Sequence, residues 1–197
     1  MEIKQSEILC QCGSKNIEYS VPSGDNRQRY HCLDCNSVFY ENPKIVAGCI
    51  PVWKDKILMC KRGIEPRYGL WTLPAGFMEN GESTKEAAER ETMEEAGTKV
   101  KDSRLYALFN LPQINQVYMM FLSNLYEPAF KAGEESLDCK LCLESEIPWD
   151  QIAFPTITYS LKLFFKDRSN GRFFLHTADL KREKSSSKLI NLASYSY

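Results

Sequence analysis

The residues of this chain with the clearest capacity for chemistry lie between positions 76 and 98, where the sequence reads GFMENGESTKEAAERETMEEAGT. If this segment is helical, Glu91, Glu94 and Glu95 fall within roughly a 100° arc, so their carboxylates share one face. Carboxylate oxygens bind hard divalent cations such as Mg²⁺ or Mn²⁺, which can also hold the phosphates of a substrate. The spacing therefore predicts a carboxylate metal site near the C-terminal end of a helix.

The flanking residues predict where this helix begins and ends. Ser83 and Glu86 form an S-x-x-E capping box, and Gly97 is the residue type that most readily adopts the left-handed conformation that ends a helix. We therefore expect a helix over residues 84–96. A crowd of carboxylates at its C-terminal end is unfavourable, because like charges repel and the helix dipole disfavours anions there. A bound cation would compensate. The alternative, a solvated acidic face, has no need of the preceding glycine loop.

Three arginines are candidates for supporting roles. Arg90 lies one turn from both Glu86 and Glu94, so its guanidinium can orient the Glu94 carboxylate behind the metal. We interpret it as an organiser of the catalytic site. Arg62 and Arg67 flank a loop that precedes a predicted strand, and they either contact substrate phosphate in a bidentate manner or are ordinary surface arginines.

The first cysteines of the chain stand in two close pairs, Cys10 and Cys12 in C-x-C spacing and Cys32 and Cys35 in C-x2-C spacing. Two such pairs separated by a polar stretch are typical of a zinc ribbon, which presents two knuckles to one Zn²⁺ ion. The C-x-C pair must be distorted relative to the usual knuckle, and His31 is a possible substitute ligand. The alternative is a degenerate knuckle that has lost its metal.

The other four cysteines have a different setting. Cys139 and Cys142 also show C-x2-C spacing, but apolar residues alternate with polar ones around them, as in a half-buried strand. Cys49 and Cys60 lie in apolar strand-like runs, where a buried thiol behaves as a small hydrophobic group. We expect all four to be strand residues.

Composition excludes several classes of protein. The chain has 197 residues, 43% hydrophobic residues and a formal net charge of −1, which provides no general attraction for nucleic acid or an anionic membrane. No stretch approaches the roughly 18 consecutive apolar residues of a membrane span. The first ten residues contain no apolar signal region, and eight cysteines without such a signal favour reduced thiols or metal ligands in the cytoplasm.

The remaining pattern predicts strands that alternate with two substantial helices. The ribbon is expected over residues 1–40 and the main domain over 41–178, and the serine-rich segment 179–197 is expected to be a flexible tail. Strands are expected at 44–53, 56–61, 70–73, 105–110, 116–126 and 136–143, and a second amphipathic helix at 157–165.

Together these features resemble the Nudix pyrophosphohydrolases. The segment from Gly76 matches the signature G-x5-E-x7-R-E-U-x-E-E-x-G-U, with Thr92 and Thr98 where a bulky aliphatic residue is preferred. The paired cysteines and the stretches FYENPKIVAGCIP, EPRYGLWTLPAGFMENGE and INQVYMMF are similar to the subfamily with an N-terminal zinc ribbon. The resemblance implies an α/β fold, a Nudix α/β/α sandwich around a mixed sheet.

The resemblance also implies roles for residues. The implied ligands of the catalytic Mg²⁺ or Mn²⁺ are the carboxylates of Glu91, Glu94 and Glu95 and the carbonyl oxygen of Ala75 or Gly76. Glu91 or Glu95 would also influence the attacking water, and Glu82 closes the loop before the helix. In related enzymes a general base often comes from a later loop, which makes Glu135 the better candidate here and Glu134 the second.

Members of this subfamily include enzymes that split ADP-ribose or FAD, so we expect such a nucleoside diphosphate derivative as substrate. The segment that follows the helix in NADH-selective relatives is absent. Nucleic acid is not expected as a partner, and a homodimer is expected from the relatives. Tyr68, Phe77, Phe109 and Tyr118 are candidates for stacking on a base. Alternatives are a ligand sensor with a binding ribbon, and an NADH or RNA-cap pyrophosphohydrolase.

Overall fold

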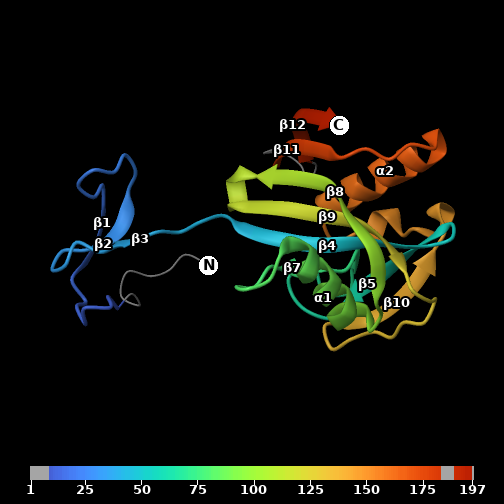
Figure 1. Cartoon of the computed structure of the whole chain (residues 1–197), viewed down its shortest axis with the longest axis horizontal. Coiled ribbons are helices and arrows are strands. Elements are labelled where there is room, and N and C mark those ends of the chain that lie inside the picture. The colour runs from blue at the N-terminus through green and yellow to red at the C-terminus, as the bar shows by residue number, and fades with distance from the viewer. Residues whose placement is uncertain (1–8, 183–188, 197) are drawn as a thin grey trace. The chain divides into compact units, whose positions relative to one another are not determined.

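The computed structural model describes residues 9–182 and 189–196, which divide into two units at residues 42 and 43. The smaller unit contains three short antiparallel strands, β1 (Ile17–Ser20), β2 (Arg29–Cys32) and β3 (Val38–Phe39) (Figure 1). Its core consists of Cys10, Ile17 and Cys32, with Tyr30 and Phe39 packed against them. A unit with so small an apolar core needs a further source of stability, such as a structural metal.

In its described residues, the larger unit is built on one mixed sheet of nine strands. These strands are β4 (Lys44–Trp53), β5 (Lys56–Arg62), β6 (Trp71–Thr72), β7 (Ala75–Phe77), β8 (Val100–Leu111), β9 (Gln116–Leu125), β10 (Ser136–Cys142), β11 (His176–Arg182) and β12 (Leu189–Ser196). Their order is β10-β5-β4-β9-β8-β11-β12, with β6 beside β5 and β7 beside β4. The pairs β4–β9 and β8–β11 are parallel and the other pairs are antiparallel.

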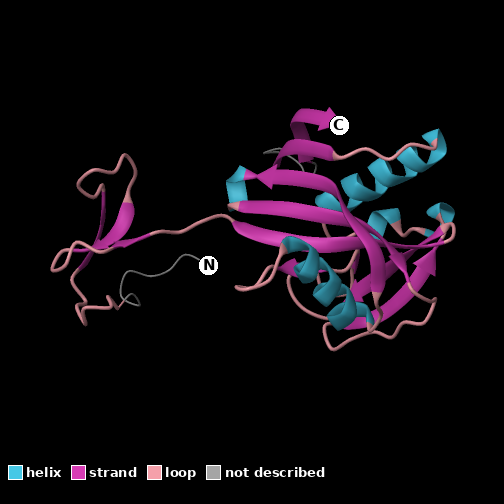
Figure 2. Ribbon diagram, in the orientation of Figure 1, coloured by secondary structure: helices cyan, strands magenta, loops and turns pink. Residues whose placement is uncertain are grey.

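Two helices, α1 (Thr84–Ala96) and α2 (Pro155–Asn170), cover the sheet (Figure 2). Successive strand residues point to opposite faces of a sheet, and the strands here are apolar on both. On β5, Ile57 and Met59 belong to the core cluster that contains α2 residues, whereas Leu58 and Cys60 belong to the cluster that contains α1 residues. The fold is therefore the predicted α/β/α sandwich around a mixed sheet.

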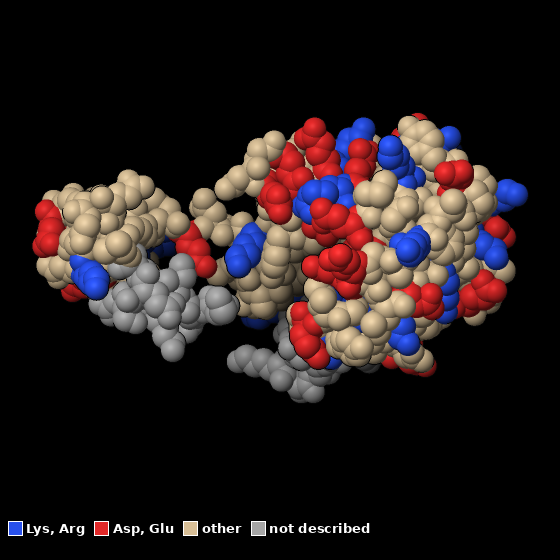
Figure 3. All heavy atoms as spheres, turned by 90° about the horizontal axis from the view of Figure 1, so that it is seen from below, with Lys and Arg blue, Asp and Glu red and all other residues tan. Residues whose placement is uncertain are grey.

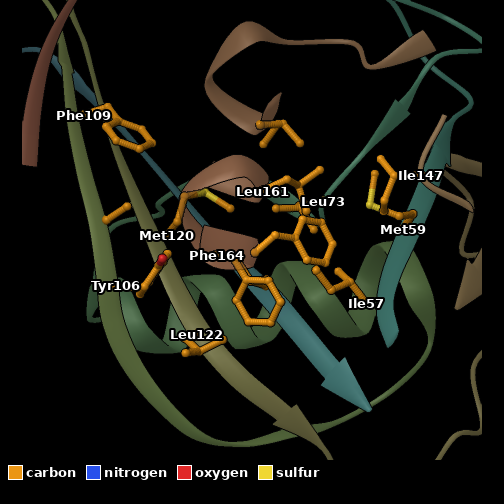
Figure 4. Packing of buried hydrophobic residues seen from close by; sticks show 14 of the residues in the cluster. Ile57, Met59, Leu73, Tyr106, Phe109, Met120, Leu122, Ile147, Leu161 and Phe164 are labelled. Carbon is orange, nitrogen blue, oxygen red and sulfur yellow. The ribbon is translucent and has the colours of Figure 1, made fainter. Parts of the chain in front are cut away.

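The core between α2 and the sheet is the larger of the two. Figure 4 shows Leu161 and Phe164 of α2 among Ile57, Met120 and Leu122 of the strands. The core on the other face is lined by small α1 side chains, which let this helix approach the sheet closely. These are Ala87, Ala88 and Ala96. Short 3-10 helices at Pro112–Ile114, Glu144–Glu146 and Trp149–Gln151 connect the longer elements.

The C-terminal segment differs from the flexible tail predicted over residues 179–197. β11 continues to Arg182, and residues 189–196 form β12, which pairs with β11. β11 adds to the open edge of β8, where His176 lies opposite Ala107. Such pairing satisfies backbone groups that an unpaired edge would leave exposed, and it joins segments that are distant in sequence. Residues 183–188 and 197 of the predicted tail lie outside the described part of the chain.

Within the described ranges, none of the helices is both long and apolar enough to cross a membrane.

Candidate functional site

The helix α1 carries the central residues of the site, and local signals set both of its ends. The Ser83 side chain accepts a hydrogen bond from the Glu86 backbone N–H, and the Glu86 carboxylate accepts one from the Ser83 N–H at 2.8 Å. At the other end Gly97 adopts φ 58° and donates its N–H to the carbonyl of Met93. Thr92, at a signature position that favours a bulky residue, is fully buried and its hydroxyl donates to the Ala88 carbonyl at 2.8 Å. The helix therefore begins and ends as its sequence predicts.

Arg90 ties the loop before α1 to the carboxylates on the helix. Its Nε and Nη2 donate to the two carboxylate oxygens of Glu82 at 3.0 and 2.8 Å, and this contact holds the pKa of Glu82 at about 2. Its Nη1 donates to Glu91 at 2.9 Å and to Glu94 at 2.8 Å. The contact with Glu94 is the one that the helical spacing predicts, whereas the Glu86 carboxylate takes part in the capping box. Arg90 thus fixes three carboxylates at once, as a bidentate guanidinium can.

Gly76 lies directly against the carboxylate of Glu91. A Cβ atom at position 76 would stand 2.3 Å from Oε1 and 2.4 Å from Oε2 of Glu91. No real Cβ contact is that short, so any side chain here would displace the carboxylate. Gly76 and Ala75 belong to β7, which pairs with β4. The backbone of Ala75 lies close enough to the Glu95 carboxylate to lower the pKa of Glu95, which burial raises. The structure therefore brings the predicted loop residues beside the predicted helix carboxylates.

The two innermost carboxylates are buried, while the third faces solvent. Glu91 and Glu95 are 8% and 6% exposed, whereas the Glu94 side chain is 56% exposed. Burial raises the pKa of Glu91, and burial together with the charge of Glu91 raises the pKa of Glu95 to about 8. The nearby Arg62 guanidinium offsets this increase in part. In Figure 3 acidic side chains gather around basic ones on the α1 face of the larger unit.

One oxygen of this group lacks a partner. Oε2 of Glu95 is buried and makes no hydrogen bond within the described residues. An unpaired buried acceptor costs about 1–3 kcal/mol, and more when it is charged. A divalent cation would satisfy this oxygen and offset the mutual repulsion of the carboxylates, and hard cations prefer carboxylate ligands of this kind. The residues present therefore fit Mg²⁺ or Mn²⁺.

The loop of residues 131–136 packs on the C-terminal end of α1. Lys131 donates its N–H to the Ala96 carbonyl at 2.9 Å, and Gly133 donates to the Glu95 carbonyl at 3.0 Å. Glu135, exposed on the same loop, accepts a hydrogen bond at its carbonyl from the Gly63 N–H at 2.7 Å. Its negative charge contributes to the raised pKa values of Glu91 and Glu95, so the side chain lies within electrostatic reach of both. The prediction of Glu135 from the sequence did not use this electrostatic effect on Glu91 and Glu95, which depends on the folded position of the loop.

The predicted substrate-binding residues separate into two groups. Arg62 is 9% exposed, donates from Nε to the Pro66 carbonyl at 2.9 Å, and lies 5.1 Å from the Phe154 ring centroid. Its charge lowers the pKa values of Glu95 and Tyr118, although burial leaves the Tyr118 pKa raised overall. Arg62 and the half-buried Tyr118 therefore belong to the surroundings of the helix carboxylates. Arg67 is exposed, at φ 70°, and its side chain makes no described contact with them.

The candidate stacking residues also differ. Phe109 is fully buried in the core and cannot stack on a substrate base. Tyr68 and Phe77 are 56% and 50% exposed. Of these, Phe77 follows Gly76 and its carbonyl accepts a hydrogen bond from Arg90 at 3.1 Å, so it lies beside the acidic site.

The four N-terminal cysteines form a second candidate metal centre. Their sulfur atoms all lie within 4.8 Å of one another, with Cys10 and Cys35 at 3.4 Å and Cys12 and Cys32 at 3.7 Å. Sulfurs bound tetrahedrally to Zn²⁺ at about 2.3 Å are about 3.8 Å apart, so the cluster fits this ion despite the C-x-C spacing. His31 is not a member, since its ring bonds to the Ser20 hydroxyl at 2.8 Å.

Two features of the acidic site could not be seen in the sequence. The bidentate contact between Arg90 and Glu82 spans eight positions and depends on how the loop folds back. The burial of Arg62 depends on Phe154, at the N-terminal end of α2, and on Pro66, in the loop after β5. Gly133 was the residue in the sequence that could have indicated the close packing of loop 131–136 on α1. A Cβ atom at this position would stand 1.7 Å from the Glu94 carbonyl oxygen.

Comparisons with known proteins agree with this architecture. The model described as NUDIX domain matches residues 42–158, and the model described as Nudix N-terminal, a zinc ribbon, matches residues 10–41. A NUDIX hydrolase from Nitrosomonas europaea with a known crystal structure is 46% identical, with a TM-score of 0.83, over 88% of this chain and 98% of that chain.

Curated relatives carry two different activities in their names. The NAD-capped RNA hydrolase NudC of Salmonella paratyphi C is 32% identical over 117 residues, which are 58% of this chain and 42% of that protein. The ADP-ribose pyrophosphatase of Methanocaldococcus jannaschii is 28% identical over 113 residues, which are 55% of this chain and 67% of that protein. The match thus spans less than half the length of the first of these relatives.

Proposed function

The chain belongs to the Nudix family, and we propose that it hydrolyses the pyrophosphate bond of a nucleoside diphosphate derivative, with ADP-ribose or FAD as substrate. Water attacks one phosphorus atom, the bond from that phosphorus to the bridging oxygen breaks, and AMP and a second phosphomonoester leave. The observation that carries the proposal is the carboxylate group of α1, in which Glu91 and Glu95 are buried and Oε2 of Glu95 is unpaired within the described residues.

The helix carboxylates are proposed to hold the catalytic cation. Glu91, Glu94 and Glu95 offer oxygens on one helix face, with Arg90 bonded to the first two. The backbone carbonyl of Ala75 or Gly76 is a further proposed ligand. A bound Mg²⁺ or Mn²⁺ would lower the pKa of water and neutralise charge on the diphosphate. Arg90 keeps two of the carboxylates in place before substrate arrives, which reduces the reorganisation needed for reaction.

Glu135 is the proposed general base. It stands on an exposed loop whose backbone is anchored to the Glu95 carbonyl through Gly133 and to Gly63, the residue that follows β5. Its carboxylate is close enough to Glu91 and Glu95 to raise their pKa values. From there it can accept the proton of a water molecule placed over the same carboxylates.

Arg62 is the proposed contact for the diphosphate. Its Nε is used by the Pro66 carbonyl, and its Nη groups make no hydrogen bond to any residue in the ranges 9–182 and 189–196. These donors lie near Glu95, where a substrate phosphate would also approach the cation. Phe77, exposed beside Gly76, is the best placed of the candidate aromatics for a substrate base. Arg67 is a weaker candidate for phosphate binding, because its exposed side chain makes no described contact with the helix carboxylates.

The test is a panel of ADP-ribose, FAD, NADH and dinucleoside polyphosphates incubated with Mg²⁺ or Mn²⁺, with AMP release as the measurement. We expect ADP-ribose or FAD to be cleaved fastest. The Glu95→Gln variant serves as the inactive control, because it keeps the shape of the side chain and removes its charge. Release of AMP from none of these substrates would contradict the proposal.

A second candidate substrate is NAD-capped RNA, because relatives at 32% identity are named as hydrolases of it. The net charge of −1 provides no general attraction for RNA, which makes it the less favoured candidate. Adding NAD-capped RNA to the panel discriminates between the two. Faster decapping than ADP-ribose cleavage at moderate salt would replace our substrate assignment.

For the cysteine cluster we propose a structural Zn²⁺ that stabilises the small unit, with a role in homodimerisation. Zinc analysis and the molecular mass in solution test these two statements separately. Well below one zinc per chain, or a monomer at micromolar concentration, would contradict the respective statement.

A further inference from the structure

Two cysteines outside the zinc cluster face each other across neighbouring strands. Cys60 of β5 and Cys139 of β10 are directly opposite in the antiparallel register, and their sulfur atoms are 3.6 Å apart. Residues in such register have Cα atoms about 4.5–5.5 Å apart, which lies within the usual range of about 4.4–6.8 Å for a disulfide. The two thiols can therefore be joined with little movement of the backbone.

The two thiols differ in access to solvent. Cys60 is fully buried, whereas Cys139 is partly exposed. A small oxidant can thus reach the Cys139 thiol, whereas the Cys60 thiol is shielded from solvent. The neighbouring cysteines lack this arrangement, since Cys49 is buried and bonded to Ser123 and Ala88, and Cys142 is buried opposite Ile57.

The pair also lies beside the backbone of two proposed catalytic residues, Glu95 and Glu135. The Cys139 thiol donates to the Glu95 carbonyl at 3.5 Å, the same oxygen that accepts the N–H of Gly133 at 3.0 Å. Three positions beyond Cys60, Gly63 donates its N–H to the Glu135 carbonyl at 2.7 Å. A covalent link between β5 and β10 would therefore act where both strands hold the loop that carries the proposed general base.

We propose that Cys60 and Cys139 are a reversible redox site at which a peroxide lowers turnover. The Cys139 thiolate attacks a peroxide oxygen, the O–O bond breaks, and a sulfenic acid and water or an alcohol form. Cys60 then attacks the Cys139 sulfur, the S–O bond breaks, and the hydroxyl leaves as water. In total two thiols are oxidised to one disulfide and one peroxide is reduced.

Disulfide formation removes the S–H donor from the Glu95 carbonyl and shortens the distance between the two sulfurs. Displacement of a catalytic group by about 1 Å can lower a rate by up to about 100-fold. We expect a decrease in kcat of about tenfold that dithiothreitol reverses. The effect on turnover rests on the proposed function, whereas disulfide formation does not.

The experiment treats the full zinc-loaded chain with hydrogen peroxide, alkylates the remaining thiols and maps linked peptides by mass spectrometry. Zinc release is followed in parallel with a colorimetric chelator, so that oxidation of the cluster cysteines is measured separately. kcat for the cleaved substrate is determined before oxidation, after it, and after reduction. The variants are Cys139→Ser, whose hydroxyl retains a donor, and Cys60→Ala, with Cys142→Ala as the matched control on the same strand as Cys139.

The expected result is a linked Cys60–Cys139 peptide, a reversible fall in kcat without zinc release, and loss of both effects in Cys139→Ser and Cys60→Ala but not in Cys142→Ala. Absence of the linked peptide overturns the redox site. A linked peptide with unchanged kcat, or an equal fall of kcat in Cys139→Ser, overturns the effect on turnover. A chain that cleaves no substrate contradicts the proposed function, and the peptide map still decides whether the redox pair exists.

Discussion

The chain contains two groups of metal-binding side chains that are built in opposite ways. The N-terminal group offers four thiols within 4.8 Å of one another, a complete tetrahedral set. The α1 group offers hard oxygens on three carboxylates, those of the buried Glu91 and Glu95 and that of the exposed Glu94, and Oε2 of Glu95 is unpaired within the described residues. A complete ligand set has no position left for substrate or water, whereas an open set does. The first group therefore has the form of a structural metal site, and the second has the form of the catalytic site proposed above.

Removal of a carboxylate from the open group should have the largest effect. We expect Glu95→Gln to lower kcat about 1,000-fold, which corresponds to about 4 kcal/mol, because the proposed cation loses a ligand. The measurement is the initial rate of AMP release at saturating Mg²⁺. Glu89→Gln is the matched control on the same helix, since Glu89 faces Lys85 and not the site. Wild-type kcat in Glu95→Gln would remove the functional distinction between the two groups.

The general base should come next in magnitude. Glu135→Gln is expected to lower kcat about 100-fold with little change in KM, because proton transfer from water is slowed. Glu134→Gln, at the adjacent exposed position of the same loop, should retain wild-type kcat. Equal losses in the two variants would show that the loop acts through its charge and not through one base.

A smaller effect is expected when the carboxylates remain but lose their support. Arg90→Lys retains the positive charge and loses the bidentate contact with Glu82, which should lower activity about 10- to 100-fold. The loss should be largest at low Mg²⁺ and should shrink as Mg²⁺ is raised, because misplaced ligands weaken metal binding. A titration of activity against Mg²⁺ measures this. A loss independent of Mg²⁺ would contradict a role through the carboxylates.

Loss of a ligand from the four-cysteine group should affect catalysis least. Cys12→Ser is expected to reduce the zinc content to well below one ion per chain and to unfold the small unit, with kcat for the nucleotide substrate close to the wild-type value. Elemental analysis and kinetics of the same sample test this, and Cys142→Ser should retain its zinc. A large fall in kcat in Cys12→Ser would mean that the thiolate group contributes to catalysis.

The smallest effect concerns stability without divalent metal. The pKa of Glu95 is raised from 4.5 to about 8 by burial and by Glu91, so the folded state binds more protons than the unfolded state between these values, and stability falls as pH rises through them. Glu95→Gln removes this penalty. We expect its Tm in EDTA to exceed that of the wild type by roughly 3 °C at pH 8, with a smaller difference at pH 5. Thermal unfolding at both pH values measures this, and an equal difference at both would contradict the assignment.

The sequence was most informative where structure depends on neighbours along the chain. α1 runs from Thr84 to Ala96 as predicted, because its capping box and Gly97 act within a few residues. The zinc cluster and the sandwich were also predicted, the latter through resemblance to a family. The strands β11 and β12 were missed, because their pairing with the edge of β8 involves segments far apart in sequence and the local composition resembles a flexible tail.

Within the site, residue types were easier to predict than contacts. Helical spacing placed three carboxylates on one face and predicted the contact of Arg90 with Glu94, but it did not predict the contact of Arg90 with Glu82. Spacing describes the helix alone, and the loop that brings Glu82 back is set by tertiary packing. The roles of Glu135 and Arg62 remain predictions for the same reason, since each depends on where a substrate lies.

The contact between Gly133 and the end of α1 has a practical consequence. The Gly133 amide proton is held by the Glu95 carbonyl, and no side chain fits at this position, because a Cβ would stand 1.7 Å from the Glu94 carbonyl oxygen. The amide of a single residue outside the helix therefore reports on whether the loop is docked. Hydrogen–deuterium exchange at Gly133 can follow release of this loop from the helix in the unmodified protein, without a label or a substrate.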